Sequence, residues 1–379
     1  MSVLNCSVCE GDSLETFHEF SSLKRVTSDA KPFPEGGKLM RCAACGALQK
    51  PNDALWTRET AAIYQQYAIY NQGGRGEPKV FEQGPGASRS DYVLNHLCQE
   101  VSLPESLSVL DIGTGTGVFL EACAQRFPEG QFYGYDLDDK FQAQLNEIPN
   151  FKKLFTGDLS TIEGTFDLIT LSHCLEHVPV PGAMLKQIRS LLKPSGLLLI
   201  QVPDAARNPF DLLVADHRTH FEQATLRHLL VSRGFSCVNN ICNWKATELS
   251  MIATPVPQEE AVLGLSNKRF EDWAKVVTEL KAWEALALSV EGPVAVWGTG
   301  MGAAWLFGYI KGQISFFVDE DTARVGSLFL GKPVKHPSEL SPAIPILAPL
   351  PPQVLKAVQE RWRALNINMP VTYPCTTGG

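Results

Sequence analysis

Short apolar runs recur between residues 108 and 203, and turns or helical segments separate them. Residues 88–100, 181–192 and 224–234 carry apolar side chains at helical spacing. Strands that alternate with helices in this way are typical of an α/β fold with a mainly parallel, Rossmann-like sheet. The runs with the length of buried strands are residues 109–112, 131–135, 166–171 and 197–202, together with a run just before Thr156.

The first strand leads directly into a glycine-rich turn, which reads Asp111-Ile112-Gly113-Thr114-Gly115-Thr116-Gly117. Glycine is needed in such a turn because the backbone bends tightly and lies close to a ligand. The second strand ends at Asp136, nineteen residues after Gly117. A carboxylate at that place can accept hydrogen bonds from a ribose diol. The sequence therefore predicts a site for a nucleoside-containing cofactor.

These segments resemble the class I S-adenosylmethionine (SAM) methyltransferases over roughly residues 90–255. The resemblance rests on the glycine turn, Asp136, Gly157-Asp158, and the segments 166–178 and 191–203. It implies that Asp111 and the glycine turn hold the methionine half of SAM, Asp136 the ribose and Asp158 the adenine. The cofactor-binding residues that it implies are Asp111, Gly113, Thr114, Gly115, Gly117, Asp136, Leu137, Asp158, Leu159 and His173.

Four of the ten cysteines form two pairs of identical spacing, Cys6 with Cys9 and Cys42 with Cys45. Two such knuckles bring four thiolates together in the tetrahedral arrangement that zinc prefers. Four sulfur ligands leave no open position for water, so we expect a structural Zn²⁺ site. The alternative is that all four are reduced thiols of a small domain.

Length and charge narrow the class of protein. A chain of 379 residues is long enough for two or three domains. Its formal charge of −8 argues against binding to nucleic acid, because such binding depends on a cationic surface. The N-terminal residues do not resemble a signal peptide, and no apolar run approaches the roughly 20 residues of a membrane span. We therefore expect a cytoplasmic protein without a membrane partner.

Three tyrosines, Tyr64, Tyr67 and Tyr70, recur every three residues in the segment 61–72. At helical spacing, such a stripe is usually a packing surface. The alternative is a wall of the substrate site, with phenol groups over a sugar or a ketone.

Two histidines lie three residues apart in the segment Asp216-His217-Arg218-Thr219-His220, which follows the predicted fifth strand. Histidine titrates near neutral pH and can accept a proton, and a neighbouring carboxylate can set its tautomer. We therefore identify His217, Asp216 and His220 as candidate catalytic residues, with His217 as the general base. The alternative is that this pattern only orders the loop.

The C-terminal third has a second strand-to-helix glycine turn, Gly298-Thr299-Gly300-Met301-Gly302-Ala303, after a predicted strand at residues 294–297. A further strand at residues 314–318 ends at Asp319. This order predicts a Rossmann-like domain. An NAD site, a grip on a nucleotide-bearing substrate and a purely structural domain all remain open for it.

The three-part layout resembles the sugar C-methyltransferases that act on nucleotide-linked deoxysugars. The resemblance implies that Asp216 and His217 lie near the keto group of a substrate. Val214 stands where that family has a tyrosine, His220 where it has an aromatic residue, and residues 27–31 differ from its usual ribbon. The implied domains are a zinc ribbon (1–60), a helical linker or substrate wall (61–90), a SAM-binding domain (91–255) and a C-terminal Rossmann-like domain (256–379).

Two classes of function follow. The first is a SAM-dependent methyltransferase that methylates a carbon next to a carbonyl in a nucleotide-linked sugar or similar small molecule, with O- or N-methylation as the alternative. The second is a non-catalytic adaptor whose zinc ribbon and Rossmann modules only sense a nucleotide. The complete set of motifs between Asp111 and His177 favours the enzyme. The oligomeric state stays open.

Overall fold

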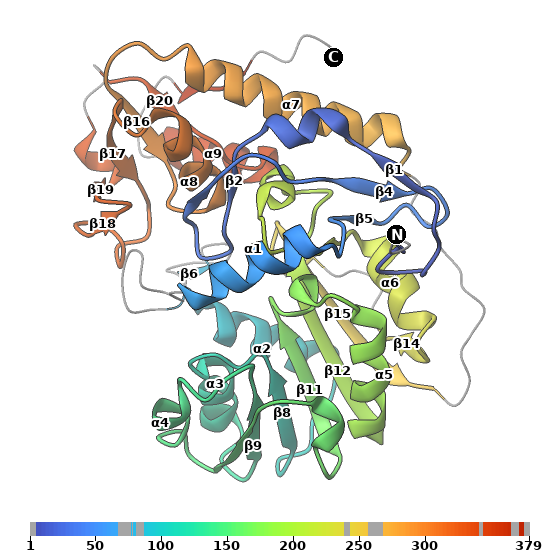
Figure 1. The fold of residues 1–379 in the computed structure, drawn as a ribbon. Coiled ribbons are helices and arrows are strands. Elements are labelled where there is room, and N and C mark those ends of the chain that lie inside the picture. The colour runs from blue at the N-terminus through green and yellow to red at the C-terminus, as the bar shows by residue number, and fades with distance from the viewer. Residues whose placement is uncertain are drawn as a thin grey trace.

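The computed structural model describes residues 5–66, 77, 79–80, 87–238, 243–256, 268–340, 344–364 and 371–374. Three main sheets organise these residues (Figure 1). The central sheet belongs to the middle of the chain, a smaller sheet to the N-terminal unit (residues 5–66) and a third to the C-terminal unit (described residues from 268 to 374).

The central sheet has seven strands in the order β10-β9-β8-β11-β12-β15-β14. Six of them run in the same direction, and β15 runs antiparallel to both of its neighbours. The strand order reverses between β8 and β11, and ligands of such sheets bind outside the carboxyl ends of the strands at that point. The strands are β8 (Ser108–Ile112), β9 (Gln131–Tyr135), β10 (Phe151–Phe155), β11 (Phe166–Ser172), β12 (Leu192–Pro203), β14 (Phe235–Cys237) and β15 (Glu248–Pro255).

The structure confirms the predicted strands of the central sheet but extends one of them. The apolar run at residues 197–202 lies within β12, which already begins at Leu192. Leu192 pairs with Phe166 and Leu197 with Leu168, so residues 193–196 bulge out between two paired stretches. Propensity alone indicates a turn there because the pairing partner on β11 is remote in sequence.

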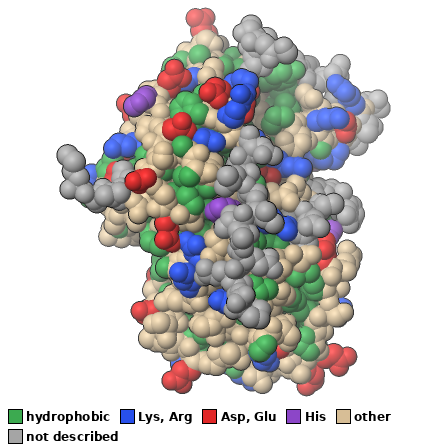
Figure 2. Space-filling view, turned by 90° about the vertical axis from the view of Figure 1, so that its right-hand side faces the viewer, with side chains coloured by type: hydrophobic (Ala, Val, Ile, Leu, Met, Phe, Trp, Pro, Cys, Tyr) green, Lys and Arg blue, Asp and Glu red, His purple; other side chains and the backbone are tan. Residues whose placement is uncertain are grey.

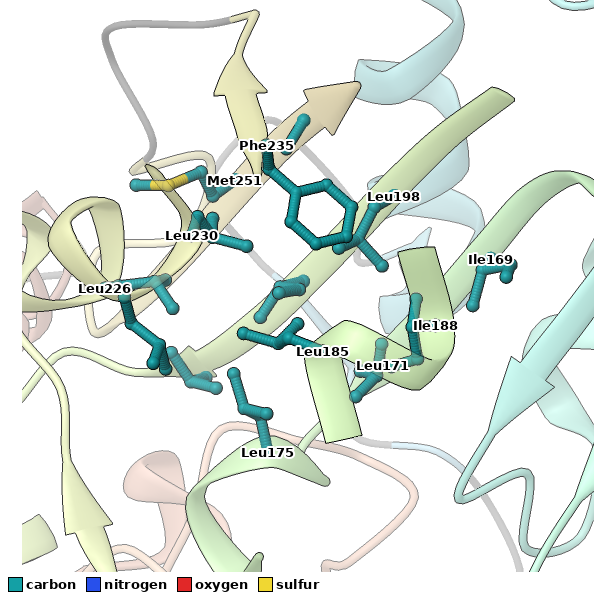
Figure 3. Close-up of a cluster of buried hydrophobic side chains, with 14 of the residues drawn as sticks. Ile169, Leu171, Leu175, Leu185, Ile188, Leu198, Leu226, Leu230, Phe235 and Met251 are labelled. Carbon is teal, nitrogen blue, oxygen red and sulfur yellow. The ribbon is translucent and has the colours of Figure 1, made fainter. Parts of the chain in front are cut away.

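Helices cover both faces of the central sheet. One face packs against α2 (Arg89–Glu100), α3 (Val118–Arg126) and α4 (Gln142–Leu145). The other packs against α5 (Pro181–Leu191) and α6 (Gln223–Val231), whose leucine and isoleucine side chains meet those of β11, β12, β14 and β15 (Figure 3). Side chains alternate between the two cores along β11, where Leu168 joins the first and Ile169 the second.

The N-terminal unit contributes three strands of a four-stranded sheet, and the middle of the chain contributes the fourth. The order is β1 (Leu14–Thr16), β4 (Met40–Cys42), β5 (Leu48–Gln49) and β13 (Thr219–His220), all antiparallel. A hairpin of β2 (Arg25–Val26) and β3 (Pro32–Phe33) extends from this unit, and residues 27–31 form its tip. The segment that carries the candidate histidines is therefore bonded to the N-terminal unit.

Helix α1 (Ala54–Gln65) contains the first residue of the tyrosine stripe. It begins after Asp53, whose carboxylate accepts a hydrogen bond from the Trp56 amide. Tyr64 lies on α1, with its ring 6.2 Å from that of His177. Tyr67 and Tyr70 lie outside the described residues. The short strands β6 (Lys79–Val80) and β7 (Ala87–Ser88) pair with each other before α2.

The C-terminal unit forms a six-stranded sheet in the order β18-β19-β17-β16-β20-β21. Its long helix α7 runs across the top of the molecule in Figure 1, and α8 follows the second glycine turn. The elements are α7 (Phe270–Leu288), β16 (Val294–Trp297), α8 (Met301–Ile310), β17 (Ile314–Val318), β18 (Leu328–Phe329), β19 (Lys332–Lys335), β20 (Ile346–Leu347), α9 (Pro352–Ala364) and β21 (Val371–Thr372).

The three parts of the chain share cores. Phe20 and Leu23 of the N-terminal unit pack in one cluster with Phe210 and with Trp305 of α8.

On the face drawn in Figure 2, Lys and Arg side chains are interspersed with Asp and Glu. Among the described residues, no helix has both the length and the apolar character needed to cross a membrane.

Gly302 on α8 provides a test of this packing. A Cβ atom at Gly302 would collide with the Pro349 carbonyl oxygen, whereas one at Gly308 of the same helix would make ordinary contacts with the side chains of Pro32, at 3.4 Å, and Lys24, at 3.7 Å. We expect Gly302→Ala to lower the free energy of unfolding by about 1–3 kcal/mol through overpacking. The matched control Gly308→Ala should be neutral or stabilising, because alanine favours the helix. Equal effects of both variants in chemical denaturation would contradict the packing.

Candidate active site

A cavity of about 480 Å³ lies beside the carboxyl ends of β8 and β11. Three parts of the chain line it: the glycine turn and the segments after β11 and β12, the hairpin tip of the N-terminal unit, and the glycine turn of the C-terminal unit. Its lining includes Ser28, Asp29, Arg89, Gly113, Thr114, Gly115, His173, Glu176, His177, Asp211, Val214, His217, Lys245, Glu248, Thr299, Gly300, Met301 and Arg324.

The glycine turn after β8 has the predicted backbone. Gly113, Gly115 and Gly117 have φ values of 76°, 51° and 83°, in the left-handed region that favours glycine. A Cβ at Gly117 would also lie 2.5 Å from the Leu145 side chain. Gly113, Thr114 and Gly115 line the cavity, and Gly117 precedes the first residue of α3.

Asp136 stands at the end of β9 and accepts hydrogen bonds from the backbone amides of Gly115, at 2.8 Å, and Leu137, at 2.7 Å. Burial raises the pKa of its carboxyl group. Asp111 is buried beneath the turn and accepts a hydrogen bond of 2.6 Å from Thr170 Oγ1. Burial raises the pKa of Asp111 to about 7. The structure thus couples Asp136 to the turn that should hold the cofactor.

The three remaining predicted cofactor residues outside the cavity lie along the same edge. The Leu137 side chain is 71% exposed, whereas that of Leu159 packs in the core. Asp158 is exposed and accepts a hydrogen bond of 2.9 Å from the Ser160 amide. For Leu159, this geometry leaves backbone groups rather than the side chain to meet a ligand.

His217 lies at the cavity and is buried, with 5% of its surface exposed. Its Nδ1 atom is 2.7 Å from Asp211 Oδ1. Burial opposes the charge on the ring, but the charge and hydrogen bond of Asp211 outweigh it, so the pKa of His217 is raised. An imidazole held by a carboxylate at one nitrogen can accept a proton at the other.

The predicted role of Asp216 in setting the tautomer of His217 was wrong. Asp211 has that position, and Asp216 instead accepts hydrogen bonds from the amide and hydroxyl of Ser28, at 2.9 and 2.5 Å. Asp216 also lies 3.4 Å from His177 Nδ1. The reason is that the 3₁₀ helix η4 (Pro209–Leu213) folds Asp211 back beneath the histidine, although it precedes His217 by six residues.

His220 is fully buried and outside the cavity lining. Its Nδ1 is 2.7 Å from Asp211 Oδ2, and its Nε2 is 2.8 Å from the ammonium group of Lys50. Burial and the charge of Lys50 lower the pKa of His220 to about 4. His220, predicted as a candidate catalytic residue, therefore lies behind His217, between Asp211 and Lys50.

The segment after β11 adds Glu176 and His177, both in the 3₁₀ helix η3 (Leu175–His177). The rings of His177 and His217 meet edge to face, with centroids 4.6 Å apart. Burial and the neighbouring His217 lower the pKa of His177. Glu176 is 1% exposed, and no donor among the described residues reaches its Oε2 atom. This carboxylate can receive a hydrogen bond from a bound molecule.

His173, a predicted cofactor residue, lies in a buried ion network at the opposite wall. It has a φ of 51°, which is uncommon for a residue other than glycine and is found mainly at functional sites. Its ring lies 3.2 Å from Glu176 and 3.3 Å from Glu248. Burial and Arg89 oppose its charge, but the two carboxylates prevail and raise the pKa of His173. Arg89 and Glu248 form a salt bridge of 2.9 Å.

The C-terminal unit reaches the cavity through Thr299, Gly300 and Met301 at the start of α8. Thr299 Oγ1 donates a hydrogen bond of 2.6 Å to Asp319, the acidic residue predicted at the end of β17. Arg324 also contacts Thr299 and lines the cavity. The start of a helix together with a guanidinium group can receive an anion.

The four predicted metal ligands come together in the N-terminal unit. The Sγ atoms of Cys6 and Cys45, and those of Cys9 and Cys42, are 3.6 Å apart, and all four lie within 4.8 Å of one another. Tetrahedral zinc with bonds of about 2.3 Å places its sulfur ligands roughly 3.8 Å apart. In both knuckles, the residue after the second cysteine has a positive φ, 65° at Glu10 and 80° at Gly46. The donor set therefore fits a structural zinc ion.

Sequence reasoning missed Lys50, Arg89, Asp211 and Glu248. Each is charged and buried, which is unusual for these residue types. Lys50 and Arg89 have partners that are remote along the chain, so no local pattern marks them, whereas Asp211 lies only six residues before His217 and Glu248 three residues after Lys245. For Glu176 a signal existed, since it belongs to the segment 166–178 on which the methyltransferase resemblance rests.

Comparison with known proteins finds matches for the central part of the chain. Residues 87–240 match the family model described as a methyltransferase domain. Trans-aconitate 2-methyltransferase of Deinococcus radiodurans is 33% identical over 97 residues, which are 25% of this chain and 37% of that protein. A ubiquinone biosynthesis O-methyltransferase of Leptothrix cholodnii is 30% identical over 131 residues, or 32% of this chain and 54% of that protein.

A malonyl-[acyl-carrier protein] O-methyltransferase of Magnetococcus marinus is 30% identical over 142 residues, covering 34% of this chain and 52% of its own length. The chain thus spans about half the length, or less, of these curated relatives. Among solved structures, that of the mitomycin 7-O-methyltransferase MmcR shares 18% identity, with a TM-score of 0.39, over 45% of this chain and 55% of that one.

The cysteine cluster yields a prediction about metal content. We expect one zinc ion per chain in protein purified without chelators, and its loss in Cys42→Ser, because three thiolates leave an open position. The unfolding temperature should fall too, since the cysteines belong to a core shared with the central sheet. The measurement is elemental analysis of the purified proteins. The control is Cys98→Ser, because Cys98 is a partly buried cysteine outside the cluster. Zinc near zero in the unaltered protein would reject the site.

Proposed function

We propose that this chain, whose residues 87–240 form a class I SAM-dependent methyltransferase domain, transfers a methyl group to a carbon next to a carbonyl in a small molecule. One observation carries the proposal. The cavity of about 480 Å³ is bounded by the glycine turn on one side and by the Asp211-held His217 on another. A methyl donor on the turn and an acceptor in the cavity would thus lie beside a base.

The chemistry divides between the bound molecules and the chain. SAM supplies a methyl group on a sulfonium sulfur, which is already a good leaving group. A carbon next to a carbonyl keeps its proton at neutral pH, so its methylation requires a base. His217 would accept that proton at Nε2, the ring nitrogen opposite the one that faces Asp211, and the electron pair left on the carbon would form the new bond to the methyl group. Positioning of the two reactants supplies the rest of the rate.

The ion network around Arg89 suits the methionine half of SAM. The cavity wall there combines Arg89, His173 and Lys245 with Glu248 and Glu176. A molecule that carries both an ammonium and a carboxylate group can be received by such mixed charge. Asp136 would hold the ribose by exchanging its bonds to the turn for bonds to the diol.

The substrate class we propose is a nucleotide-linked sugar. Thr299, Gly300 and Arg324 of the C-terminal unit face the same cavity as His217, and the start of α8 offers an anion site for a diphosphate. The Oε2 atom of Glu176, which has no partner among the described residues, would accept a hydrogen bond from a sugar hydroxyl. In this proposal, each of the four domains expected from the sequence has its own role. Residues 1–60 form a zinc-bound scaffold and residues 61–90 a wall of the substrate site, while residues 91–255 bind SAM and residues 256–379 bind the nucleotide.

O-methylation is the second candidate, because the relatives from L. cholodnii and M. marinus are named O-methyltransferases. A hydroxyl needs weaker assistance from a base than a carbon acid does. The two reactions differ in the product, since only C-methylation removes a carbon-bound proton of the substrate. Incubation of the purified protein with SAM and a panel of sugar nucleotides, followed by mass spectrometry and NMR of the product, tests the function and separates the two.

Asp136→Ala tests the assignment of the ribose site. Loss of hydrogen bonds to a charged acceptor should weaken SAM binding by about 1.5–3 kcal/mol, or roughly tenfold or more in Kd. Calorimetric titration measures this. Asp138→Ala, in the same exposed loop, is the control and should bind SAM normally. Unchanged affinity in Asp136→Ala, with an unchanged unfolding temperature, would falsify the assignment.

His217→Gln tests the base. We expect kcat to fall by about 10²–10⁴-fold while SAM still binds, because a general base typically contributes that factor. In the unaltered enzyme, kcat/KM should rise with pH through a pKa above the ordinary histidine value of about 6.5, since the base must be unprotonated and Asp211 raises its pKa. Exchange of the substrate proton for solvent deuterium should be lost as well.

His96→Gln on α2 provides the matched control and should keep full activity. If His217→Gln retains kcat and changes only KM or stability, the histidine orders the loop and O-methylation becomes the better proposal.

A further inference from the structure

A chain of short hydrogen bonds runs from the N-terminal unit to the ring of His217. Lys50 Nζ lies 2.8 Å from His220 Nε2, His220 Nδ1 lies 2.7 Å from Asp211 Oδ2, and Asp211 Oδ1 lies 2.7 Å from His217 Nδ1. Lys50, His220 and Asp211 are at most 2% exposed. Only His217 and Asp211 reach the cavity, so the other two act from behind it.

The donors and acceptors along this chain determine where each proton lies. An ammonium group only donates, so His220 Nε2 must be an acceptor and carries no proton. The proton of a neutral His220 is then on Nδ1, from which it donates to Asp211. An ionised carboxylate only accepts, so the bond from His217 Nδ1 must also carry a proton. The Nε2 atom of neutral His217 is therefore left with its lone pair.

Lys50 also holds the backbone of the same segment. Besides the N–H group that faces His220, one N–H group donates to the Val214 carbonyl oxygen at 2.5 Å, and the third is shared between the carbonyl oxygens of Leu212 and His217, at 3.3 and 3.2 Å. In addition, β5 pairs with β13, and Ala215 donates a backbone hydrogen bond to Val26. The N-terminal unit thus fixes both the path of this segment and the side chains within it.

We propose that Lys50, His220 and Asp211 are positioning residues that hold His217 in one tautomer, with Nδ1 protonated toward Asp211 and Nε2 a proton acceptor. The N-terminal unit is then part of the catalytic machinery and more than a scaffold, since it supplies the first donor of the relay. The proposal rests on the proposed function only where it links this tautomer to turnover. The tautomer itself can be measured without substrate.

The pH behaviour of His217 depends on all the charged groups around it. Three of them lie outside its own segment: Glu176 and His177 in η3, and Lys50 directly after β5. Asp211, Glu176 and Asp216 each favour the protonated ring, whereas burial opposes it. The titratable or charged groups that surround the ring are Asp211, Asp216, His220, Glu176, His177 and Lys50.

The test is a ¹⁵N NMR titration of the histidine rings in the full-length protein, which reports tautomer and pKa directly. His217→Gln and His220→Gln spectra assign the two signals among the eight histidines. In the unaltered protein, at a pH above the pKa of each ring, we expect both neutral rings to carry their single proton on Nδ1. A proton on Nε2 of either neutral ring would overturn the relay. The tautomers are measured in the unaltered protein, and the two variants serve only for assignment.

Asp211→Asn supplies the second arm. An amide cannot accept at both ends, so one histidine must change tautomer, and the lost charge should lower the pKa of His217 by roughly one unit or more. The rising limb of the kcat/KM profile should move to lower pH by the same amount while the maximal rate falls. SAM affinity should stay unchanged. An unchanged tautomer and pKa of His217 would contradict the proposal.

Lys50→Met removes the first donor and should raise the pKa of His220, because the ammonium charge lowers it. Glu59→Gln is the control, since it breaks a salt bridge to buried Arg25 in the same unit and leaves the relay intact. A shift of His220 in both variants would indicate general loosening and reject a specific role for Lys50. If NMR shows the expected shifts while turnover stays unchanged in Asp211→Asn, the relay stands and the proposed base fails.

Discussion

The buried ammonium group of Lys50 is the interaction on which the arrangement of the site depends. A charge without solvent is costly unless hydrogen bonds and opposite charges surround it. Here three carbonyl oxygens and a histidine nitrogen, all from residues 212–220, converge on it. Burial still lowers the pKa of Lys50 to about 7, opposed by the charge of Asp211. These contacts hold the segment after β12 in place, although it has little regular structure.

That constraint joins the three parts of the chain at one cavity. The hairpin tip reaches it through Ser28, which bonds Asp216, and the C-terminal unit reaches it through Thr299. Phe210 meanwhile packs against Trp305 of α8, so the same segment contacts both outer units. A cysteine cluster in the N-terminal unit therefore bears on the chemistry indirectly. It holds β4 and β5, and β5 holds β13, which ends at His220.

The site also concentrates features that reduce stability elsewhere in proteins. His173 has a left-handed backbone, one carboxylate oxygen of Glu176 has no hydrogen-bond partner among the described residues, and Asp111 is buried with its pKa raised to about 7. Such departures from local rules are expected at functional sites, where the surrounding structure must compensate. The two cores of the central sheet supply that compensation, because their apolar side chains fill both faces. The edge of a well-packed sheet thus carries polar groups that can form hydrogen bonds with bound molecules.

The sequence by itself determined the central sheet, both glycine turns and the cysteine cluster. These are local features: apolar periodicity, a backbone that only glycine adopts readily, and paired cysteines at equal spacing. It also pointed to His217, through a short pattern next to a predicted strand. Only the tertiary structure shows that Asp211, and not Asp216, is the hydrogen-bond partner of His217. It also shows that His220 lies behind the cavity and that Lys50, far upstream in the sequence, contacts it. The physical reason is that hydrogen-bond partners of a buried charge are chosen by distance in space, and the loops that bring them together have no periodicity to read.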